Sequence, residues 1–356
     1  MPGSPNGIVP SPNRALVLAA SMLVLFLAAC GSEPIENEVA TTGPDARQSG
    51  DAAVAGSPTG GVEVSKDGDE PWRAEMARDV GIPAGPITIH ELSGRVAFAS
   101  TRNGPHTVFK QELRSDAEPE RLGYGFEPAW SPDGQTIAFT GSYLETGDEI
   151  AVMNADGSNV RQLTSADGQD RGPTWSPDGR TIAFWSERDD REREIYVVSA
   201  EDGSERRLTN DSFADLWPSW SPHGNEIAYE SYRGDGAELF AVSPHGGTPR
   251  RITPKGLDAR DPAWSPDASQ IAFVSSTDRG WALALIAADG TRVRKLAEMN
   301  GVRNPAWSPD GRFIIFACTL PTIPNEDICI VDAAGERMLN LTNDGDGFDW
   351  EPAWTR

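Results

Sequence analysis

The sequence predicts an all-β protein built from repeats of four short strands, and three observations support this prediction. A seven-residue string, PAWSPDG at 128–134, returns as PTWSPDG, PSWSPHG, PAWSPDA and PAWSPDG, and a shortened copy, PAWT, lies near the end of the chain. The Trp residues of these copies, at positions 130, 175, 220, 264, 307 and 354, are spaced by 45, 45, 44, 43 and 47 residues. Each complete copy is followed by short apolar segments separated by turn dipeptides. Four strands in about 40–45 residues are typical of a β-propeller, whose sheets cover one another's faces.

The elements of one repeat follow from its residue types. In SPDG, Pro presets the φ of a tight turn, Asp bonds nearby backbone and Gly tolerates a positive φ. The strand after each turn is apolar at every position, which indicates burial on both faces. These strands are 137–139, 182–184, 227–229, 271–273 and 314–316. A third strand, a second turn and a short fourth strand follow, so each repeat is predicted to be an antiparallel four-stranded sheet.

The N-terminal residues resemble a bacterial lipoprotein signal. Arg14 precedes an apolar run from Ala15 to Ala29, which is too short to span a membrane and ends in Leu-Ala-Ala-Cys-Gly. This ending resembles the bacterial lipobox, which implies cleavage before Cys30, acylation of Cys30, and a protein tethered to a membrane. We expect a signal peptide at 1–29 and an extracytoplasmic location. Gly31 and Ser32 would suit the outer membrane, facing the periplasm, in a Gram-negative cell.

Residues 30–86 are predicted to be a disordered acidic tether, because Gly, Pro, Ala and Ser dominate and large apolar residues are scarce. The propeller is expected to occupy 87–356. Its first repeat, with a strand at Arg95–Ser100, lacks the opening string. We expect Glu351–Arg356 to supply the missing strand, which would close a ring of six sheets with no exposed edge. A seventh sheet that includes Ile87–His90 is the alternative.

These repeats resemble a known family. The strings PAWSPDG, IAF, EIAVMNADG at 149–157 and RQLT at 161–164 resemble the repeat of TolB-like six-bladed propellers, over about three quarters of the chain. The resemblance implies the fold. It does not specify the function, because scaffolds, lids and enzymes all use this fold. In two copies the turn differs: His223 replaces Asp, and Ala268 replaces Gly.

The charge limits the partners. The chain has a formal net charge of −23, which argues against nucleic acid because phosphate binding needs a basic patch. This charge does not exclude cationic partners or metal ions. We expect a monomeric propeller that contacts the membrane only through its lipid.

The segments that lead into the innermost strands should form the mouth of a central channel. They combine acids with arginines and aromatic residues, which are the types that protein interfaces use as anchors. We predict a rim that binds a protein or peptide; the other interpretation is that these charges pair with one another. The rim residues are Phe126, Glu127, Asp170, Arg171, Asp215, Trp217, Asp258, Arg260, Asp261, Arg303, Asp349, Trp350 and Glu351.

A second set of charges recurs between the second and third strands, and its recurrence favours ion pairs that support the architecture. The arginines are Arg102, Arg188, Arg233 and Arg279, and the acids before the third strands are Glu149, Glu194, Glu238 and Asp327.

The sequence contains no recognisable catalytic constellation. The four His residues have no metal-ligand spacing, and no G-x-S-x-G string occurs. The run Asn343–Asp349 suggests a calcium loop, but Phe348 occupies a ligand position. We therefore expect no catalytic residues, no metal and no cofactor, with Ca²⁺ as a remaining possibility. The favoured function is a TolB-like binding scaffold in the cell envelope. The alternative is a carbohydrate-binding protein or metal-dependent enzyme that uses the acidic mouth.

Cys318 and Cys329 fall on neighbouring predicted strands. Export would permit a disulfide. Strict alternation, however, places the two side chains on opposite faces, so we expect two buried free thiols and leave the disulfide open.

Overall fold

The computed structural model describes residues 75–76, 78–102, 104–115, 117–143, 147–189, 192–321, 325–343 and 347–356. All of them belong to one compact unit, Val64–Arg356. The predicted signal peptide, Cys30 and most of the predicted tether lie outside the described residues. Within them, no helix has the length and apolar character needed to cross a membrane.

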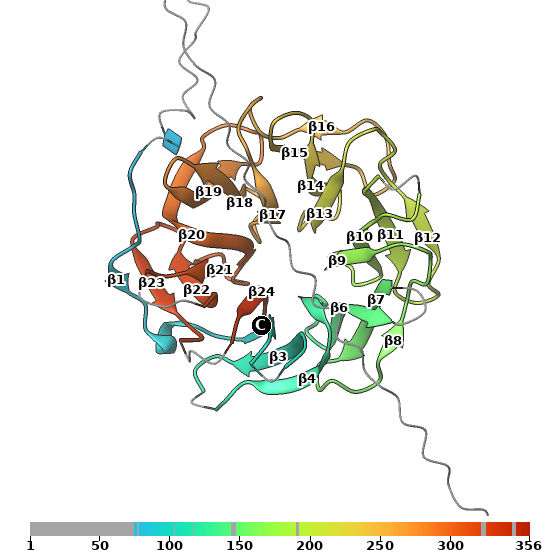
Figure 1. Ribbon diagram of the computed structural model, residues 1–356, viewed down its shortest axis with the longest axis horizontal. Coiled ribbons are helices and arrows are strands. Elements are labelled where there is room, and N and C mark those ends of the chain that lie inside the picture. Colours follow the sequence, from blue (N-terminus) through green and yellow to red (C-terminus); the bar gives the residue numbers. More distant parts are fainter. Residues whose placement is uncertain are drawn as a thin grey trace, which may run out of the picture. The chain divides into compact units, whose positions relative to one another are not determined.

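Four of the repeats form separate four-stranded antiparallel sheets, arranged around a common centre (Figure 1). The first contains β24 (Asp349–Thr355), β2 (Arg95–Ser100), β3 (Thr107–Glu112) and β4 (Glu120–Tyr124). The second contains β5 (Phe126–Trp130), β6 (Thr136–Tyr143), β7 (Gly147–Asn154) and β8 (Arg161–Gln162). The third contains β9 (Asp170–Trp175), β10 (Thr181–Ser186), β11 (Glu194–Ser199) and β12 (Glu205–Arg207). The fourth contains β13 (Asp215–Trp220), β14 (Ile227–Tyr232), β15 (Ala237–Val242) and β16 (Arg250–Arg251).

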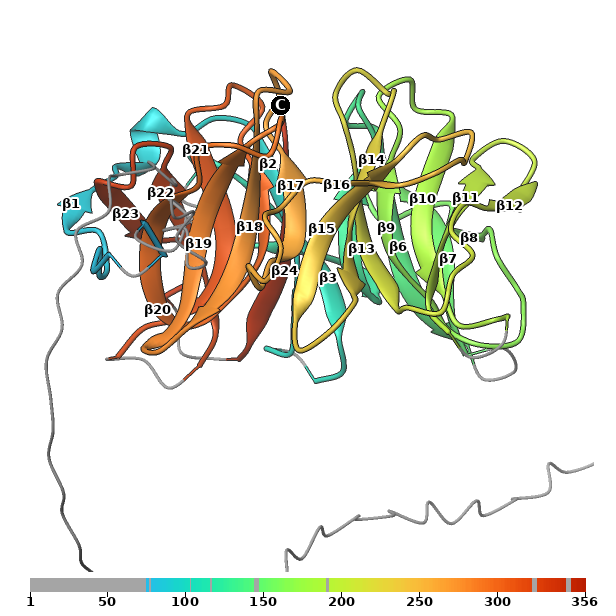
Figure 2. The same cartoon turned by 90° about the horizontal axis from the view of Figure 1, so that it is seen from above.

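The last two repeats form one eight-stranded sheet, where we expected two separate sheets. Its strands are β17 (Arg260–Trp264), β18 (Gln270–Thr277), β19 (Gly280–Ala287), β20 (Arg294–Trp307), β21 (Phe313–Thr319), β22 (Asp327–Asp332), β23 (Arg337–Asn340) and β1 (Gly85–Pro86). The reason is β20, which pairs with β19 through its first half and with β21 through its second half. The outer strand of one repeat therefore continues into the inner strand of the next. The strands of all the sheets cross the thickness of the unit (Figure 2).

The C-terminal strand joins the first sheet, as the sequence predicts. β24 pairs antiparallel with β2, with Val96 opposite Trp354. The Trp354 indole N–H donates to the Ser93 carbonyl at 2.8 Å, and its ring stacks on Phe313 with 6.4 Å between centroids. Because Phe313 belongs to β21, the last strand also ties the first sheet to its neighbour.

The apolar strand that follows each turn is buried on both faces, as predicted. Ile137 and Phe139 pack in one cluster with Ala97 and Val108 of the first sheet. Ala138, between them, packs in the next cluster with residues of the third sheet. The core therefore lies between the sheets, and each four-stranded sheet contributes to two clusters.

The repeated turn is held by its serine and aspartate. Ser131 Oγ donates to Asp133 Oδ1 at 2.6 Å, and the Gly134 N–H donates to the Ser131 carbonyl at 2.9 Å. The hydrogen bond from Ser131, together with one from the Gln135 N–H to Asp133 Oδ1, lowers the pKa of Asp133. In the copy with Ala268 in place of Gly, the alanine adopts a φ of 59°, a strained conformation for a residue with a Cβ.

The described N-terminal residues pack on the outside of the eight-stranded sheet. β1 pairs in parallel with β23 and so extends the eight-stranded sheet. Residues 87–90, which were the alternative start of a seventh sheet, form no strand. A 3-10 turn covers Ile89–Glu91. Further upstream, Lys295 Nζ donates to the Met76 carbonyl at 2.8 Å. The Glu298 N–H donates to the Gly81 carbonyl at 2.9 Å. Contacts with the sheets thus begin before residue 87.

Cys318 and Cys329 form a disulfide, so the expectation of two free thiols is wrong. The register pairs Cys329 with Phe316 and Cys318 with Asp327. Residues directly opposite each other in a ladder share a face, and Phe316 shares its face with Cys318 two positions on. The sequence argument failed because it assigned faces to the two strands without knowing the register between them.

We predict that the disulfide contributes to stability. Replacing both cysteines with alanine should lower the free energy of unfolding by about 2–3 kcal/mol, the scale for a loop of this length. Thermal unfolding followed by circular dichroism, with and without dithiothreitol, checks this. The reductant should lower the melting temperature of the parent protein to that of the Cys318→Ala/Cys329→Ala variant and leave the variant unchanged. An equal effect of reductant on both proteins would contradict the prediction.

Candidate binding site at the channel mouth

Every innermost strand has an irregular residue at the same place, directly before the repeat proline. The ladder between the two inner strands shifts register there in each repeat. The six residues share a positive φ: Glu127 (53°), Gly172 (64°), Trp217 (50°), Asp261 (50°), Asn304 (50°) and Glu351 (55°). Such a bulge turns a side chain away from the regular pleat. These six residues line one central cavity of about 320 Å³, together with the prolines that follow them.

Five of these six residues carry a Cβ, so the conformation costs about 1–2 kcal/mol at each of the five. Hydrogen bonds between neighbouring sheets hold the backbone in place. The Glu127 N–H donates to Glu351 Oε2 at 2.7 Å, and the Gly172 N–H donates to Glu127 Oε2 at 2.7 Å. On the other side of the channel, the Asn304 N–H donates to Asp261 Oδ2 at 3.0 Å. A channel carboxyl thus accepts the N–H of the equivalent residue in the next repeat.

Where the repeat position lacks a carboxyl, another strand can supply it. Trp217 has none, and the Asp261 N–H instead donates to Glu230 Oε2 of β14 at 3.0 Å. Glu127 also accepts a hydrogen bond from Thr140 Oγ1 at 2.5 Å. We call Glu127, Glu351, Glu230 and Asp261 the channel carboxyls. They form two close pairs, one of Glu127 with Glu351 and one of Glu230 with Asp261.

The pKa values of all four channel carboxyls are raised above their usual values. Burial raises the pKa of Glu230 to about 8, and the neighbouring Asp261 carboxyl adds to the effect. Burial and the Glu127 charge raise the pKa of Glu351 well above its usual value. Burial also raises the pKa values of Glu127 and Asp261. None of the ion pairs within the described ranges involves these four groups, so desolvation outweighs the attraction of the nearby arginines.

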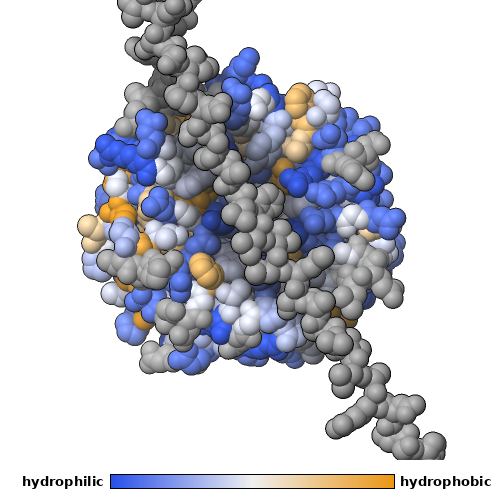
Figure 3. All heavy atoms as spheres, viewed as in Figure 1, coloured by the Kyte–Doolittle hydropathy of each residue, from blue (hydrophilic) through white to orange (hydrophobic). Residues whose placement is uncertain are grey.

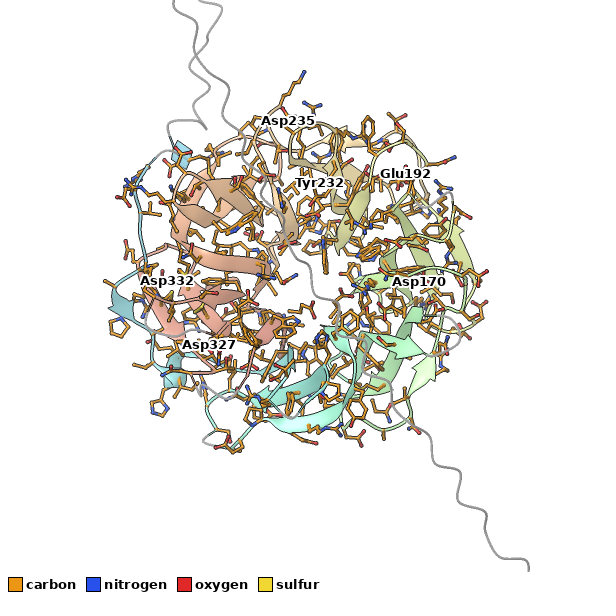
Figure 4. The ribbon with its side chains drawn as sticks, in the orientation of Figure 1. Asp170, Glu192, Tyr232, Asp235, Asp327 and Asp332 are labelled. Atoms are coloured by element: carbon orange, nitrogen blue, oxygen red, sulfur yellow. A yellow bond between two sulfur atoms is a disulfide. The ribbon has the colours of Figure 1, made fainter. Side chains whose placement is uncertain are left out.

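A second cavity, of about 550 Å³, opens at the end of the channel where the innermost strands begin. We call it the mouth. Its aromatic lining residues are Trp217, Tyr232, Trp281 and Trp350, and its arginines are Arg260 and Arg303. Glu230, Asp261, Glu326 and Glu351 add carboxyls. In Figure 4, Tyr232 is labelled on the fourth sheet, next to the sheet that carries Asp170.

Two arginines at the mouth are held by acids. Arg303 Nη2 lies 2.6 Å from Glu326 Oε1, and its side chain is still 52% exposed. Arg260 Nε lies 3.1 Å from Asp258 Oδ1, and its guanidinium lies 5.0 Å from the Trp281 ring centroid and 5.7 Å from that of Tyr232. The mouth therefore presents Arg260 held against two aromatic rings and Arg303 held by one acid.

The structure brings part of the predicted rim together. Glu127 and Trp217 line the channel, and Arg260, Arg303 and Trp350 line the mouth. Trp217, Asp261 and Glu351 line both. Arg171 pairs with Asp148 and lies 5.1 Å from the centroid of the buried Phe126 ring.

Three predicted rim acids are buried inside the sheets and are not available at the mouth. Asp170 pairs with Arg188, Asp349 pairs with Arg102, and Asp215 accepts a hydrogen bond from Ser231. Asp258 is only partly buried, where it holds Arg260. For these residues the alternative interpretation, in which the rim charges satisfy partners within the protein, describes the geometry.

The recurring arginines do form ion pairs, but not with the acids that precede the third strands. Arg102 and Arg188 pair with Asp349 and Asp170, while Arg233 pairs with Asp211 and Arg279 with Asp79. The acids before the third strands have other partners: Glu149 accepts from Thr164 and Asp327 from Asn340. Glu194 and Glu238 pair with Arg207 and Arg251. The repeat period identified both sets correctly, whereas their pairing depends on three-dimensional proximity.

Sequence reasoning missed several mouth residues. Tyr232, Trp281 and Glu326 lie at or beside the ends of second and third strands, and only the strand lengths bring them to the mouth. His106 lies edge-on to both Phe126 and Trp350, with 5.6 and 5.2 Å between ring centroids. The only sequence signal for this contact is the position of His106 in the loop between the second and third strands. Among the described residues, no group of three or more potential ligands could hold a metal ion. Part of the run considered as a calcium loop lies outside those residues.

Sheets of this kind with a central channel define a propeller of repeated four-stranded units. A family model described as the TolB beta propeller domain matches residues 88–193 and 189–356. The chain therefore belongs to this family, as its repeats suggested. No curated protein matches it at the level of sequence.

Solved structures agree on the fold. TolB from Acinetobacter baumannii is similar with a TM-score of 0.66 and 24% identity, over 73% of this chain and 66% of that one. A putative TolB from Agrobacterium tumefaciens has a TM-score of 0.53 and 24% identity, over 62% of this chain and 96% of that one. The Kuenenia stuttgartiensis hydrazine synthase has a TM-score of 0.61 and 16% identity, over 74% of this chain and 46% of that one. Scaffolds and enzymes share the fold, so these similarities establish the architecture alone.

We predict that Glu230 makes stability depend on pH. Its folded pKa of about 8 lies above the usual value of 4.5, so between these values the folded state binds a proton that the unfolded state has lost. The stability that this bound proton contributes is fully present below pH 4.5, and it is lost as the pH rises through 8. Glu230→Gln should remove it and flatten the fall in melting temperature between pH 5 and 9.

The matched control is Glu201→Gln at an exposed turn. It should leave the pH profile of the melting temperature unchanged. If Glu230→Gln and the control give the same profile as the parent protein, burial does not raise the pKa of Glu230.

Proposed function

We propose that this protein is a lipid-anchored, six-bladed propeller of the cell envelope that binds a segment of another protein at the mouth. The count of six treats the two halves of β20 as parts of two blades, and the pairing of β24 with β2 supports a closed ring. We place the signal peptide at 1–29, the tether at 30–86, with its last described residues packed on the eight-stranded sheet, and the propeller at 87–356. A TolB-like role and an extracytoplasmic location agree with the family.

The single observation that carries the proposal is the composition of the mouth. Trp, Tyr and Arg are the side chains that contribute most to binding energy at protein interfaces. Here three Trp, one Tyr and two Arg line one cavity of about 550 Å³. Arg260 is held by Asp258, and Arg303 is held by Glu326, so little side-chain entropy is lost when a partner contacts them.

The geometry also favours binding over chemistry. The channel carboxyls, whose pKa values are raised, already accept backbone hydrogen bonds that support the strained residues before the prolines. Such perturbed pKa values occur in structural networks as well as in active sites. We infer that the channel carboxyls maintain the shape of the mouth and that the aromatic and arginine side chains contact the partner.

We predict that Arg303→Glu abolishes partner binding, because it places a negative charge among the carboxyls of the mouth. Arg279→Glu is the matched control: both arginines are more than half exposed, and each has an ion pair with an acid. Photo-cross-linking in intact cells, from a benzoylphenylalanine placed at Trp350, should join a defined partner. The cross-link should disappear with Arg303→Glu and persist with Arg279→Glu. A partner captured equally by both variants would contradict binding at the mouth.

We predict that the membrane attachment depends on Cys30. Cys30→Ser removes the thiol that would be acylated, so the protein should move from the membrane fraction to the soluble fraction after cell lysis. Immunoblots of the two fractions check this, and mass spectrometry of the parent protein should detect a diacylated or triacylated N-terminal cysteine. A Cys30→Ser protein that stays in the membrane fraction would exclude the lipid anchor.

A further inference from the structure

A set of three polar residues recurs where the inner strands begin. In the third sheet, Asp170 lies three residues before the repeat proline and directly opposite Ser186 in the ladder. Arg188 Nε donates to Ser186 Oγ at 2.9 Å, and Arg188 Nη2 pairs with Asp170. The buried aspartate therefore has a guanidinium as its partner. The first sheet repeats this arrangement with Asp349, Ser100 and Arg102.

The fourth sheet has the same three residues, but its arginine has a different partner. Asp215 lies opposite Ser231 and accepts a hydrogen bond from its hydroxyl at 2.5 Å. Arg233 Nε donates to the same hydroxyl oxygen at 2.9 Å, as in the other two sheets. Arg233 Nη2, however, pairs at 2.6 Å with Asp211, in the loop before β13. Asp215 is buried, and its Oδ2 accepts no hydrogen bond from the described residues.

A second polar group in this sheet also lacks a partner. Tyr229 occupies the β14 position at which the other repeats have phenylalanine, and it lies two residues before Ser231 on the same face of the strand. Within the described part of the chain, the Tyr229 hydroxyl is buried and forms no hydrogen bond. Burial and then the charge of Asp215 raise the pKa of Tyr229, so the hydroxyl is within electrostatic reach of this carboxyl. Unpaired buried polar groups are rare in native proteins, and this sheet has two of them.

The acids around Asp215 oppose its ionisation. Burial has the largest effect, and the charges of Asp211 in the loop and Glu194 in β11 add to it, while hydrogen bonds from Ser231 and Thr209 act in the other direction. The result is a pKa of about 7 for Asp215. The carboxyl therefore keeps its proton below pH 7 and loses it as the pH rises through 7.

Three arginines lie on the elements around Asp215. The side chains of Arg207 and Arg193 are held by other acids. Arg193 meets Asp215 through its backbone carbonyl, which accepts the Asp215 N–H at 2.7 Å. Arg233 differs from these two because it shares the Ser231 hydroxyl with Asp215. It is therefore the cation that can serve this carboxylate.

We propose that Arg233 is a latch with two positions, one on Asp211 and one on Asp215, and that the ionisation of Asp215 moves it from the first to the second. The second position is the one that the equivalent arginines occupy in the first and third sheets. A buried carboxylate without a partner is costly, so an ion pair with Arg233 stabilises Asp215 once its proton is lost. The Tyr229 hydroxyl supplies a further donor for this state.

Asp211 can give up its arginine because it lies near the surface. Its side chain is 32% exposed, so water can solvate the carboxylate after Arg233 leaves. The face of the molecule shown in Figure 3 is mostly hydrophilic, with apolar residues in small areas, so a solvated acid is an ordinary feature of this surface. The exchange thus replaces an unpaired buried charge with an unpaired exposed one.

The latch connects the loop before β13 to one wall of the mouth. In the position on Asp211, the Arg233 guanidinium lies 4.7 Å from the Phe213 ring centroid, and Asp211 Oδ1 accepts the Phe213 N–H at 2.9 Å. The loop therefore loses contacts when Arg233 moves. Tyr232, directly before Arg233, and Trp217, further along β13, line the mouth. The latch itself concerns the fourth sheet and does not depend on what the mouth binds.

Hydrogen exchange of the full-length protein tests the latch. Between pH 5.5 and 8.5, after correction for the intrinsic effect of pH, protection of the Asp211 and Phe213 amides should fall by about tenfold, the factor for one hydrogen bond to a charged group. Asp215→Asn cannot ionise and should keep the protection at both pH values. Asp211→Asn should have low protection at both. The control Asp235→Asn, an exposed acid between β14 and β15, should behave as the parent.

Protection that does not change with pH in the parent protein, or that changes equally in Asp215→Asn, overturns the proposal. Crystal structures of the parent protein at pH 5.5 and pH 8.5 test the latch without a variant, so the result does not depend on whether Asp215→Asn folds. Arg233 should pair with Asp211 at the lower pH and with Asp215 at the higher pH. The same partner at both pH values would also overturn the proposal.

Discussion

Every repeat sheet is apolar on both faces, and this constraint governs the rest of the molecule. Ile137 and Phe139 need the first sheet as a cover, whereas Ala138 between them needs the third. A sheet of this kind can bury its surface only between two neighbours, so the sheets succeed one another around a centre. The first sheet takes its inner strand from the other end of the sequence, and Trp354 packs there against both Phe313 and the Ser93 carbonyl.

The same arrangement brings six equivalent strands together at the channel, where a second constraint acts. The residue before each proline adopts a positive φ, and neighbouring carboxyls bond to four of these backbone N–H groups. Proline removes one donor from each inner strand and disfavours a helical conformation in the residue before it. The bulge therefore needs support from outside its own strand, and the carboxyl of the adjacent repeat supplies it. The resulting channel is acidic in composition, and burial raises the pKa values of its carboxyls.

The periodic features could be predicted from the sequence, because repetition averages out local ambiguity. The turns, the doubly buried strands and the pairing of the last strand with Val96 all followed from the repeated string. Features that depend on register or on a single departure from the repeat could not. The continuous β20 was missed because the repeat pattern treats the outer strand of one repeat and the inner strand of the next as separate elements. The disulfide was missed because the pairing of Phe316 with Cys329 was unknown. Glu230 was missed because it replaces, from another strand, a carboxyl that Trp217 lacks.

The departures from the repeat also indicate where function lies. A fully symmetrical ring would present the same residues six times and would bind nothing in a single orientation. In this chain the position before the proline is Glu, Gly, Trp, Asp, Asn and Glu in turn, so the channel carboxyls cluster in two pairs on separate parts of the wall. The outer edges vary in the same way: the N-terminal segment covers two, and three are short and charged. Stability requires the shared features of the repeats, so a specific partner must be recognised through the positions at which they differ.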